Sequence, residues 1–129
     1  MKSKEPSELL VCVTCRFDKN KSDDSPRPGQ QLFDALLKQQ LPDRMQLVGV
    51  RCLQNCKKGC TIALRGQQRW TYIFGNVNQS LHMDMLLQGA KSYHNTIDGI
   101  IAWNKRPDHF KKNCIARIPP LLPTGVQNA

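Results

Sequence analysis

The stretch Met45-Gln-Leu-Val-Gly-Val50 runs almost directly into Cys52, and this junction of an apolar segment with a cysteine loop decides the fold. The segment is short, apolar and partly β-branched, so it predicts a buried strand. Residues 9–13, Leu-Leu-Val-Cys-Val, have the same character and predict another strand. Residues 30–40 between them place apolar side chains on one face of a helix. A strand–helix–strand unit of this kind predicts two parallel strands joined by a right-handed crossover.

Two further strands and a helix are expected after the cysteine loop. Residues 61–64 and 70–74 predict a β-hairpin, with residues 65–69 as its turn. Ser80 is suitable as the N-cap of a helix over residues 81–93. That helix is expected to turn four side chains inward, namely Leu81, Met85, Leu86 and Ala90.

These elements predict an α/β sandwich of the thioredoxin type, with a mixed four-stranded sheet and two main helices. Residues 96–129 are less regular and are expected to form a C-terminal tail that packs along the domain. The length of 129 residues fits one domain over residues 1–129. Residues 1–7 and 124–129 at its two ends are expected to be flexible.

Composition narrows how the six cysteines can be used. The N-terminus is charged and lacks the apolar core of a signal peptide, and no stretch is apolar enough for a membrane helix. We therefore expect a cytoplasmic protein that does not enter a membrane. In that reducing compartment, closely spaced cysteines are more often metal ligands or redox thiols than disulfides.

The cysteines fall where strands are expected to end. Cys12 and Cys15 follow the first strand, and Cys52 and Cys56 follow the second, with Cys60 four residues further on. Because parallel neighbouring strands end at the same edge of a sheet, the two pairs are expected to meet there. Four thiolates at one site suit either a [2Fe–2S] cluster or structural zinc.

A third interpretation is a thiol-redox site at Cys12-Val-Thr-Cys15, which would make the protein a thiol-disulfide enzyme. It is weakened because a reactive cysteine is commonly activated at a helix N-terminus. Here a polar, proline-containing segment separates Cys15 from the expected helix. Both cysteine pairs have spacings that zinc sites also use, so spacing leaves zinc and iron–sulfur open.

Residues 50–64, Val-Arg-Cys-Leu-Gln-Asn-Cys-Lys-Lys-Gly-Cys-Thr-Ile-Ala-Leu, followed by Trp70-Thr-Tyr-Ile-Phe-Gly75, resemble the cluster loop of thioredoxin-like [2Fe–2S] ferredoxins. The resemblance implies a [2Fe–2S] cluster bound by Cys12, Cys15, Cys52 and Cys56. Cys60 stands where those ferredoxins usually have a proline, and it is a further candidate metal ligand. Gly59 is expected to adopt a backbone conformation that other residues avoid.

The sequence also resembles a bacterial family of small metal-binding proteins of unestablished function. The shared motifs are Cys-x-x-Cys-Arg at residues 12–16, Cys-x-x-x-Cys-x-x-Gly-Cys at 52–60, Trp-x-x-Arg-Pro at 103–107 and Arg-Ile-Pro-Pro at 117–120. This resemblance implies a link to tetrapyrrole or cobalamin metabolism. The expected function is electron transfer or iron and redox sensing, with a non-redox zinc module or metal carrier as the alternative.

The formal charge of +9 is compatible with nucleic acid, an acidic protein partner or simply a solvated surface, and by itself it supports only weak, salt-sensitive attraction to an acidic surface. We expect the partner to be an acidic redox or metal-metabolism protein. A local basic run comprises Lys105, Arg106, Lys111, Lys112 and Arg117. Aromatic residues are too few and too poorly interleaved with this run to favour nucleic-acid binding. The sequence leaves the oligomeric state undecided, and a homodimer is one possibility. Nothing in the sequence resembles a catalytic nucleophile, a phosphate loop or a carboxylate pair, so no independent catalytic site is expected. The three histidines are expected at the surface or at helix ends, and Cys114 is expected to be a buried thiol.

Overall fold

The computed structural model describes residues 5–14, 27–54 and 59–121. A single five-stranded sheet runs through it, and the strand order is β2-β1-β3-β4-β5. The strands are β1 (Ser7–Cys12), β2 (Met45–Val50), β3 (Cys60–Gly66), β4 (Thr71–Val77) and β5 (Cys114–Ile118). The helices are α1 (Pro28–Leu37), α2 (Gln79–His94) and α3 (Asp108–Asn113), with a 3-10 turn, η1, at Trp103–Lys105.

The first half of the sheet follows the expected strand–helix–strand unit. β1 and β2 are parallel, with Ser7 opposite Met45 and Cys12 opposite Val50. β3 is antiparallel to β1, β4 is antiparallel to β3, and β5 is antiparallel to β4. The sheet is therefore mixed, as predicted, and the expected hairpin is formed by β3 and β4.

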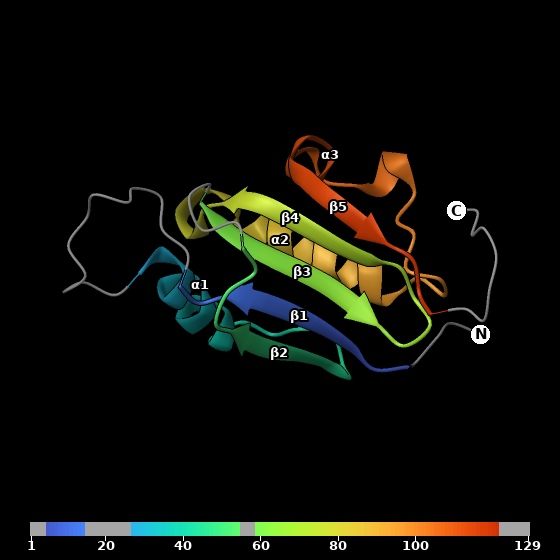
Figure 1. Cartoon of the computed structure of the whole chain (residues 1–129), viewed down its shortest axis with the longest axis horizontal. Helices are drawn as coiled ribbons and strands as arrows, with labels where there is room; N and C mark the ends of the chain where they lie inside the picture. Colours follow the sequence, from blue (N-terminus) through green and yellow to red (C-terminus); the bar gives the residue numbers. More distant parts are fainter. Residues whose placement is uncertain (1–4, 15–26, 55–58, 122–129) are drawn as a thin grey trace.

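Both long helices cover the same face of the sheet. α1 and α2 contact each other and lie behind the strands in Figure 1, whereas α3 contacts α2 and β4 near the β5 edge. Alternate side chains of the central strands point into this layer, which buries apolar area and so favours the folded chain. The most deeply buried apolar side chains include Leu9, Ile62, Leu64, Tyr72, Phe74, Leu86, Tyr93 and Phe110.

The expectation of four strands and an irregular tail was wrong. The tail contains η1, α3 and a fifth strand, β5. All five side chains of β5 are exposed, because this edge strand pairs only with β4 among the described strands. Its short sequence, Cys-Ile-Ala-Arg-Ile, therefore lacks the buried apolar run that marks the other strands.

Helix boundaries also differ from the expectation. α1 begins at Pro28, because proline is favoured in the first turn where its missing N–H is not needed. The N-cap of α2 is Asn78 rather than Ser80, and the Asn78 side chain accepts hydrogen bonds from the backbone N–H groups of Ser80 and Leu81. Leu81 lies in this first turn and is 76% exposed, so its expected inward position was wrong. Leu86 and Ala90 are buried as expected.

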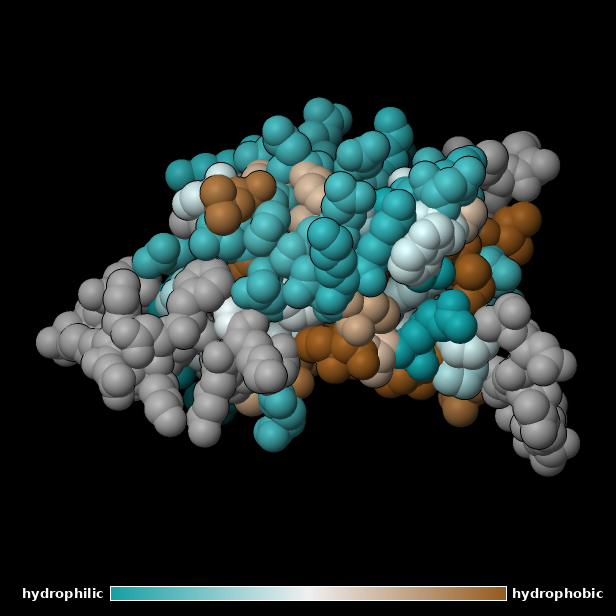
Figure 2. Space-filling model, turned by 90° about the horizontal axis from the view of Figure 1, so that it is seen from above, coloured by the Kyte–Doolittle hydropathy of each residue, from teal (hydrophilic) through white to brown (hydrophobic). Residues whose placement is uncertain are grey.

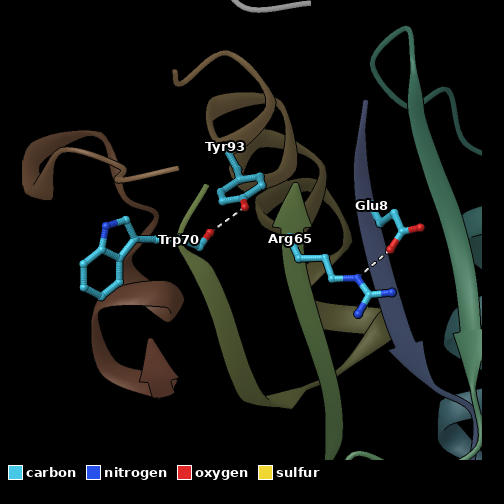
Figure 3. A network of polar contacts seen from close by, with 4 residues as sticks. All are labelled: Glu8, Arg65, Trp70 and Tyr93. Atoms are coloured by element: carbon cyan, nitrogen blue, oxygen red, sulfur yellow. Dashed lines mark hydrogen bonds and ion pairs between the residues drawn. The ribbon is translucent and has the colours of Figure 1, made fainter. Parts of the chain in front are cut away.

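Two polar contacts tie elements together (Figure 3). The Tyr93 hydroxyl of α2 donates to the carbonyl oxygen of Trp70 at 2.5 Å, which holds the helix against the β3–β4 turn. Arg65 of β3 donates to the Glu8 carboxylate of β1 at 2.6 Å, and this ion pair is partly exposed. Within the described residues, no helix is both long and apolar enough to cross a membrane.

Candidate metal centre

Three cysteines lie at one edge of the sheet because three strand ends meet there. β1 ends at Cys12, and the parallel strand β2 ends at Val50, two residues before Cys52. β3 runs antiparallel to β1 and therefore begins at this same edge, with Cys60 as its first residue. The prediction that the cysteines after β1 and β2 share one edge is thus confirmed for Cys12 and Cys52, and the structure adds Cys60.

Cys12 and Cys60 form a buried pair of thiols, with exposed fractions of 0% and 1%. Burial first, and then the neighbouring Cys12 thiol, raise the pKa of the Cys60 thiol to about 12, which favours its neutral form. Two buried sulfurs next to each other cannot both be ionised without a compensating cation. A thiophilic metal would supply that charge, because thiolates bind zinc and iron as anions.

Cys52 is exposed, unlike the pair, and its sulfur accepts a hydrogen bond from the backbone N–H of Gln54 at 3.2 Å. Gln54 reaches this position with a positive φ of 65°, which is uncommon for a residue with a side chain. N–H donors to sulfur stabilise thiolates at metal sites. Gly59, just before β3, has a φ of 76°, which confirms the unusual backbone expected there.

Thr14 and Arg27 surround the end of β1, and sequence reasoning did not single them out. The Thr14 hydroxyl lies 3.6 Å from the Cys12 sulfur and donates to the carbonyl oxygen of Arg51. Arg27, at the N-cap of α1, donates from Nη1 to the Thr14 carbonyl oxygen at 3.1 Å. These contacts connect the segments after β1 and β2 and bring a guanidinium toward the edge that holds the cysteines.

Part of the predicted ligand set cannot be placed. Cys15 and Cys56 lie outside the described residues. Among the residues that the structure does describe, no three or more His, Cys, Asp or Glu side chains come close enough together to hold a metal ion. The described part thus supplies the Cys12–Cys60 pair and an exposed Cys52 after the end of β2, and the metal-ligand roles of Cys12, Cys15, Cys52, Cys56 and Cys60 all stay predictions.

Cys114 is separate from this group. It opens β5, where it pairs with Phe74, and it is exposed rather than buried as expected. β3 and β4 lie between β5 and β1. At a strand spacing of about 4.8 Å, Cys114 in β5 is roughly 14 Å from Cys12 in β1 across the sheet. Cys114 is therefore a suitable control position for the site.

The histidines are less scattered than the sequence suggests. His82 of α2 and His109 of α3 are in ring contact, with centroids 4.0 Å apart and the ring planes tilted by 42°, and both are partly buried. His94 is buried at the end of α2, where its Nδ1 lies 2.6 Å from the Ser7 hydroxyl oxygen. These residues are distant in sequence and share no spacing, so only the packing of α2 against α3 and β1 brings the contacts about.

The sequence also matches the model of a protein family. Residues 9–120 match a family described as "Protein of unknown function (DUF1636)", and this span includes all six cysteines. The chain belongs to this family. No curated protein and no solved structure matches the chain. The description of this family names no activity. A function for the chain therefore has to be inferred from its residues.

Proposed function

We propose that the chain is a metal-binding protein that carries a [2Fe–2S] cluster for electron transfer or for sensing iron or redox state. The observation that carries this proposal is the buried Cys12–Cys60 pair at the sheet edge that also holds Cys52. When bound, such a cluster supplies one-electron exchange. The ligands proposed from the sequence are Cys12, Cys15, Cys52 and Cys56.

Cys60 also belongs among the proposed ligands. Its sulfur is buried, it neighbours Cys12, and its thiol is held neutral by burial when no metal compensates it. Five sulfurs therefore compete for four positions, and substitution of Cys60 tests whether it holds one of them.

We propose further that the domain is a thioredoxin-like sandwich extended by β5. The order β2-β1-β3-β4, the parallel β1–β2 pair and the antiparallel β3 and β4 support this assignment. α1 and α2 on one face support it as well. In this arrangement Cys12, Cys52 and Cys60 lie at one edge of the sheet, with Cys52 exposed to solvent, where an acidic redox or metal-metabolism protein could exchange an electron. The link to tetrapyrrole or cobalamin metabolism rests on the sequence resemblance alone.

A non-redox zinc module or metal carrier is the second candidate. The same donor set suits zinc, and the exposed position of Cys52 would favour passing a metal to another protein. The two candidates differ in colour, because a [2Fe–2S] protein absorbs visible light and a zinc–thiolate protein does not.

The experiment compares four proteins purified without air: the wild type, Cys12→Ser, Cys60→Ser and Cys114→Ser. The wild type and Cys114→Ser are expected to be brown, whereas Cys12→Ser and Cys60→Ser lose most of the visible absorption. Circular dichroism of each variant checks that the fold is retained. Equal loss in Cys114→Ser would contradict the proposed site. A colourless wild type with one zinc ion would establish the second candidate instead.

A further inference from the structure

A basic groove lies between α2 and the segment that contains η1 and α3. Its volume is about 710 Å³, and it opens widely to solvent. The face seen in Figure 2 is mostly hydrophilic, with hydrophobic residues in patches toward its edges. Five of the groove-lining side chains are basic: His82, Arg106, His109, Lys111 and Lys112. Asp108 is the acidic member among the lining residues.

The cationic wall of the groove is held in place by the fold. The Arg106 guanidinium donates from Nε to the carbonyl oxygen of Ile101 at 2.8 Å and from Nη2 to the Tyr72 hydroxyl at 3.4 Å. Lys111 and Lys112 lie in the last turn of α3. Because these cations come from adjacent turns of one segment, they add to a local positive potential rather than spreading around the surface.

Trp103 contributes a large aromatic ring that contacts Arg106 and Lys111, two of the residues that line the groove. Its side chain is 60% exposed. The Arg106 guanidinium carbon lies 5.2 Å from the ring centroid, and the Lys111 ammonium nitrogen lies 5.5 Å from it. Tryptophan and arginine are the side chains that most often dominate protein–protein binding energy. An exposed tryptophan that contacts two cations is therefore a suitable anchor for a partner.

The two histidines in ring contact, His82 and His109, do not offer a metal site in this groove. His109 is engaged at both ring nitrogens, by Gly75 O at 3.0 Å from Nε2 and by the Asn113 amide nitrogen at 3.2 Å from Nδ1. The Nδ1 atom of His82 accepts the backbone N–H of Asn78 at 2.9 Å, so a neutral His82 carries its proton on Nε2. His82 is thereby a hydrogen-bond donor, which suits an anionic ligand rather than a metal.

We propose that this groove, together with Trp103, is the docking surface for an acidic segment of a partner protein. Charge complementarity selects an anionic occupant, and the open shape with an exposed aromatic anchor favours a protein segment over an enclosed small molecule. That the partner is a redox or metal-metabolism protein rests on the function proposed above. The charge and shape of the groove support a docking surface independently of that function.

The test measures binding of a fluorescein-labelled poly-glutamate peptide to the full chain by fluorescence anisotropy. Lys111→Glu with Lys112→Glu reverses two charges in the groove. Lys38→Glu with Lys91→Glu, at exposed positions elsewhere, gives the same net charge of +5, which is +9 minus 4. The groove variant is expected to bind roughly tenfold more weakly, because close charge pairs lose attraction and gain repulsion. The control is expected to stay within about twofold of wild type at physiological salt, where charges farther away than about 8 Å are screened.

A second variant, Trp103→Phe, reports on the anchor without changing charge. It is expected to weaken the peptide binding while thermal unfolding stays close to that of the wild type, because the ring is mostly exposed. Equal weakening by the two lysine pairs would overturn the proposal, since only net charge would then matter. Tighter binding of a single-stranded oligonucleotide than of the peptide would also overturn the proposal. So would full displacement of the peptide by inorganic pyrophosphate added at the same concentration of negative charge. A colourless protein that still binds the peptide through the groove would refute the cluster and leave this inference standing.

Discussion

Arg69 is a buried arginine whose contacts join three parts of the fold. Its side chain is 2% exposed. Nη1 donates to the carbonyl oxygens of Tyr93 and His94 at the end of α2, and Nη2 donates to the Glu5 carbonyl oxygen at 2.9 Å. Carbonyl groups at a helix C-terminus lack partners within the helix and carry partial negative charge, so a cation there stabilises the helix end.

We expect Arg69→Met to lower the free energy of unfolding by about 2–4 kcal/mol, because it removes the hydrogen bonds that a buried guanidinium donates to the carbonyl oxygens of Tyr93, His94 and Glu5. The matched control is Arg65→Met, which breaks only the partly exposed ion pair with Glu8 and should cost less than about 1 kcal/mol. Urea unfolding followed by circular dichroism measures both. Equal losses would mean that the buried contacts of Arg69 contribute no more than a surface pair.

His82 gives stability a pH dependence. Partial burial first, and then the neighbouring His109, lower the pKa of its imidazole below the usual value. As pH falls, the unfolded chain takes up this proton before the folded chain does, so folding weakens below the unfolded pKa of about 6.5. We expect the urea midpoint to fall between pH 7.5 and pH 5. In His82→Gln the fall should be smaller, and an unchanged fall would show that other groups cause it.

At the scale of elements, α2 and α3 meet at a contact that requires glycine. A Cβ atom on Gly89 would lie 2.2 Å from a ring carbon of Phe110. That ring cannot easily move, because it is buried and stacks on Phe74 with centroids 3.8 Å apart. The close approach of α3 to α2 also builds the basic groove, so this one contact links packing to the proposed docking surface.

Gly89→Ala is expected to destabilise the protein by about 1–3 kcal/mol through overpacking, although alanine favours helices over glycine by about 1 kcal/mol. Gln88→Ala on the adjacent exposed position of α2 is the control and should be nearly neutral. Thermal unfolding of the two variants distinguishes them. A more stable Gly89→Ala protein would show that α3 is free to move away from α2.

The elements with strong patterns were predictable, and the weak ones were not. β2 was placed at its observed bounds because its run is mostly apolar, and the hairpin was placed because its two runs flank a polar turn. β5 was missed because its apolar run is short and leads through Arg117 into Pro119 and Pro120, which indicates a tail rather than a strand. The cap of α2 was misplaced by two residues because Asn78 and Ser80 are both good caps, and only the backbone geometry chooses between them.

On the scale of the whole molecule, the site follows from topology. β1 and β2 are parallel and β3 is antiparallel to β1, so the ends of β1 and β2 and the start of β3 lie at the same edge of the sheet. β1 ends at Cys12, β2 ends two residues before Cys52, and β3 begins at Cys60. Sequence spacing predicted this meeting for Cys12 and Cys52. It did not predict that Cys60 would be buried beside Cys12, because the start of β3 was expected one residue later, at Thr61. The contact between His82 and His109 could not be predicted from the sequence either, because it depends on how α3 packs against α2.

The most direct measurement is the metal and sulfide content of the full chain purified without air. A [2Fe–2S] protein should contain iron and acid-labile sulfide in equal amounts, about two of each per chain, with visible absorption that falls on reduction. A Cys56→Ala variant should lose both elements together. Zinc at about one ion per chain with no sulfide would contradict the cluster, and a wild-type iron and sulfide content in Cys56→Ala would contradict the ligand assignment.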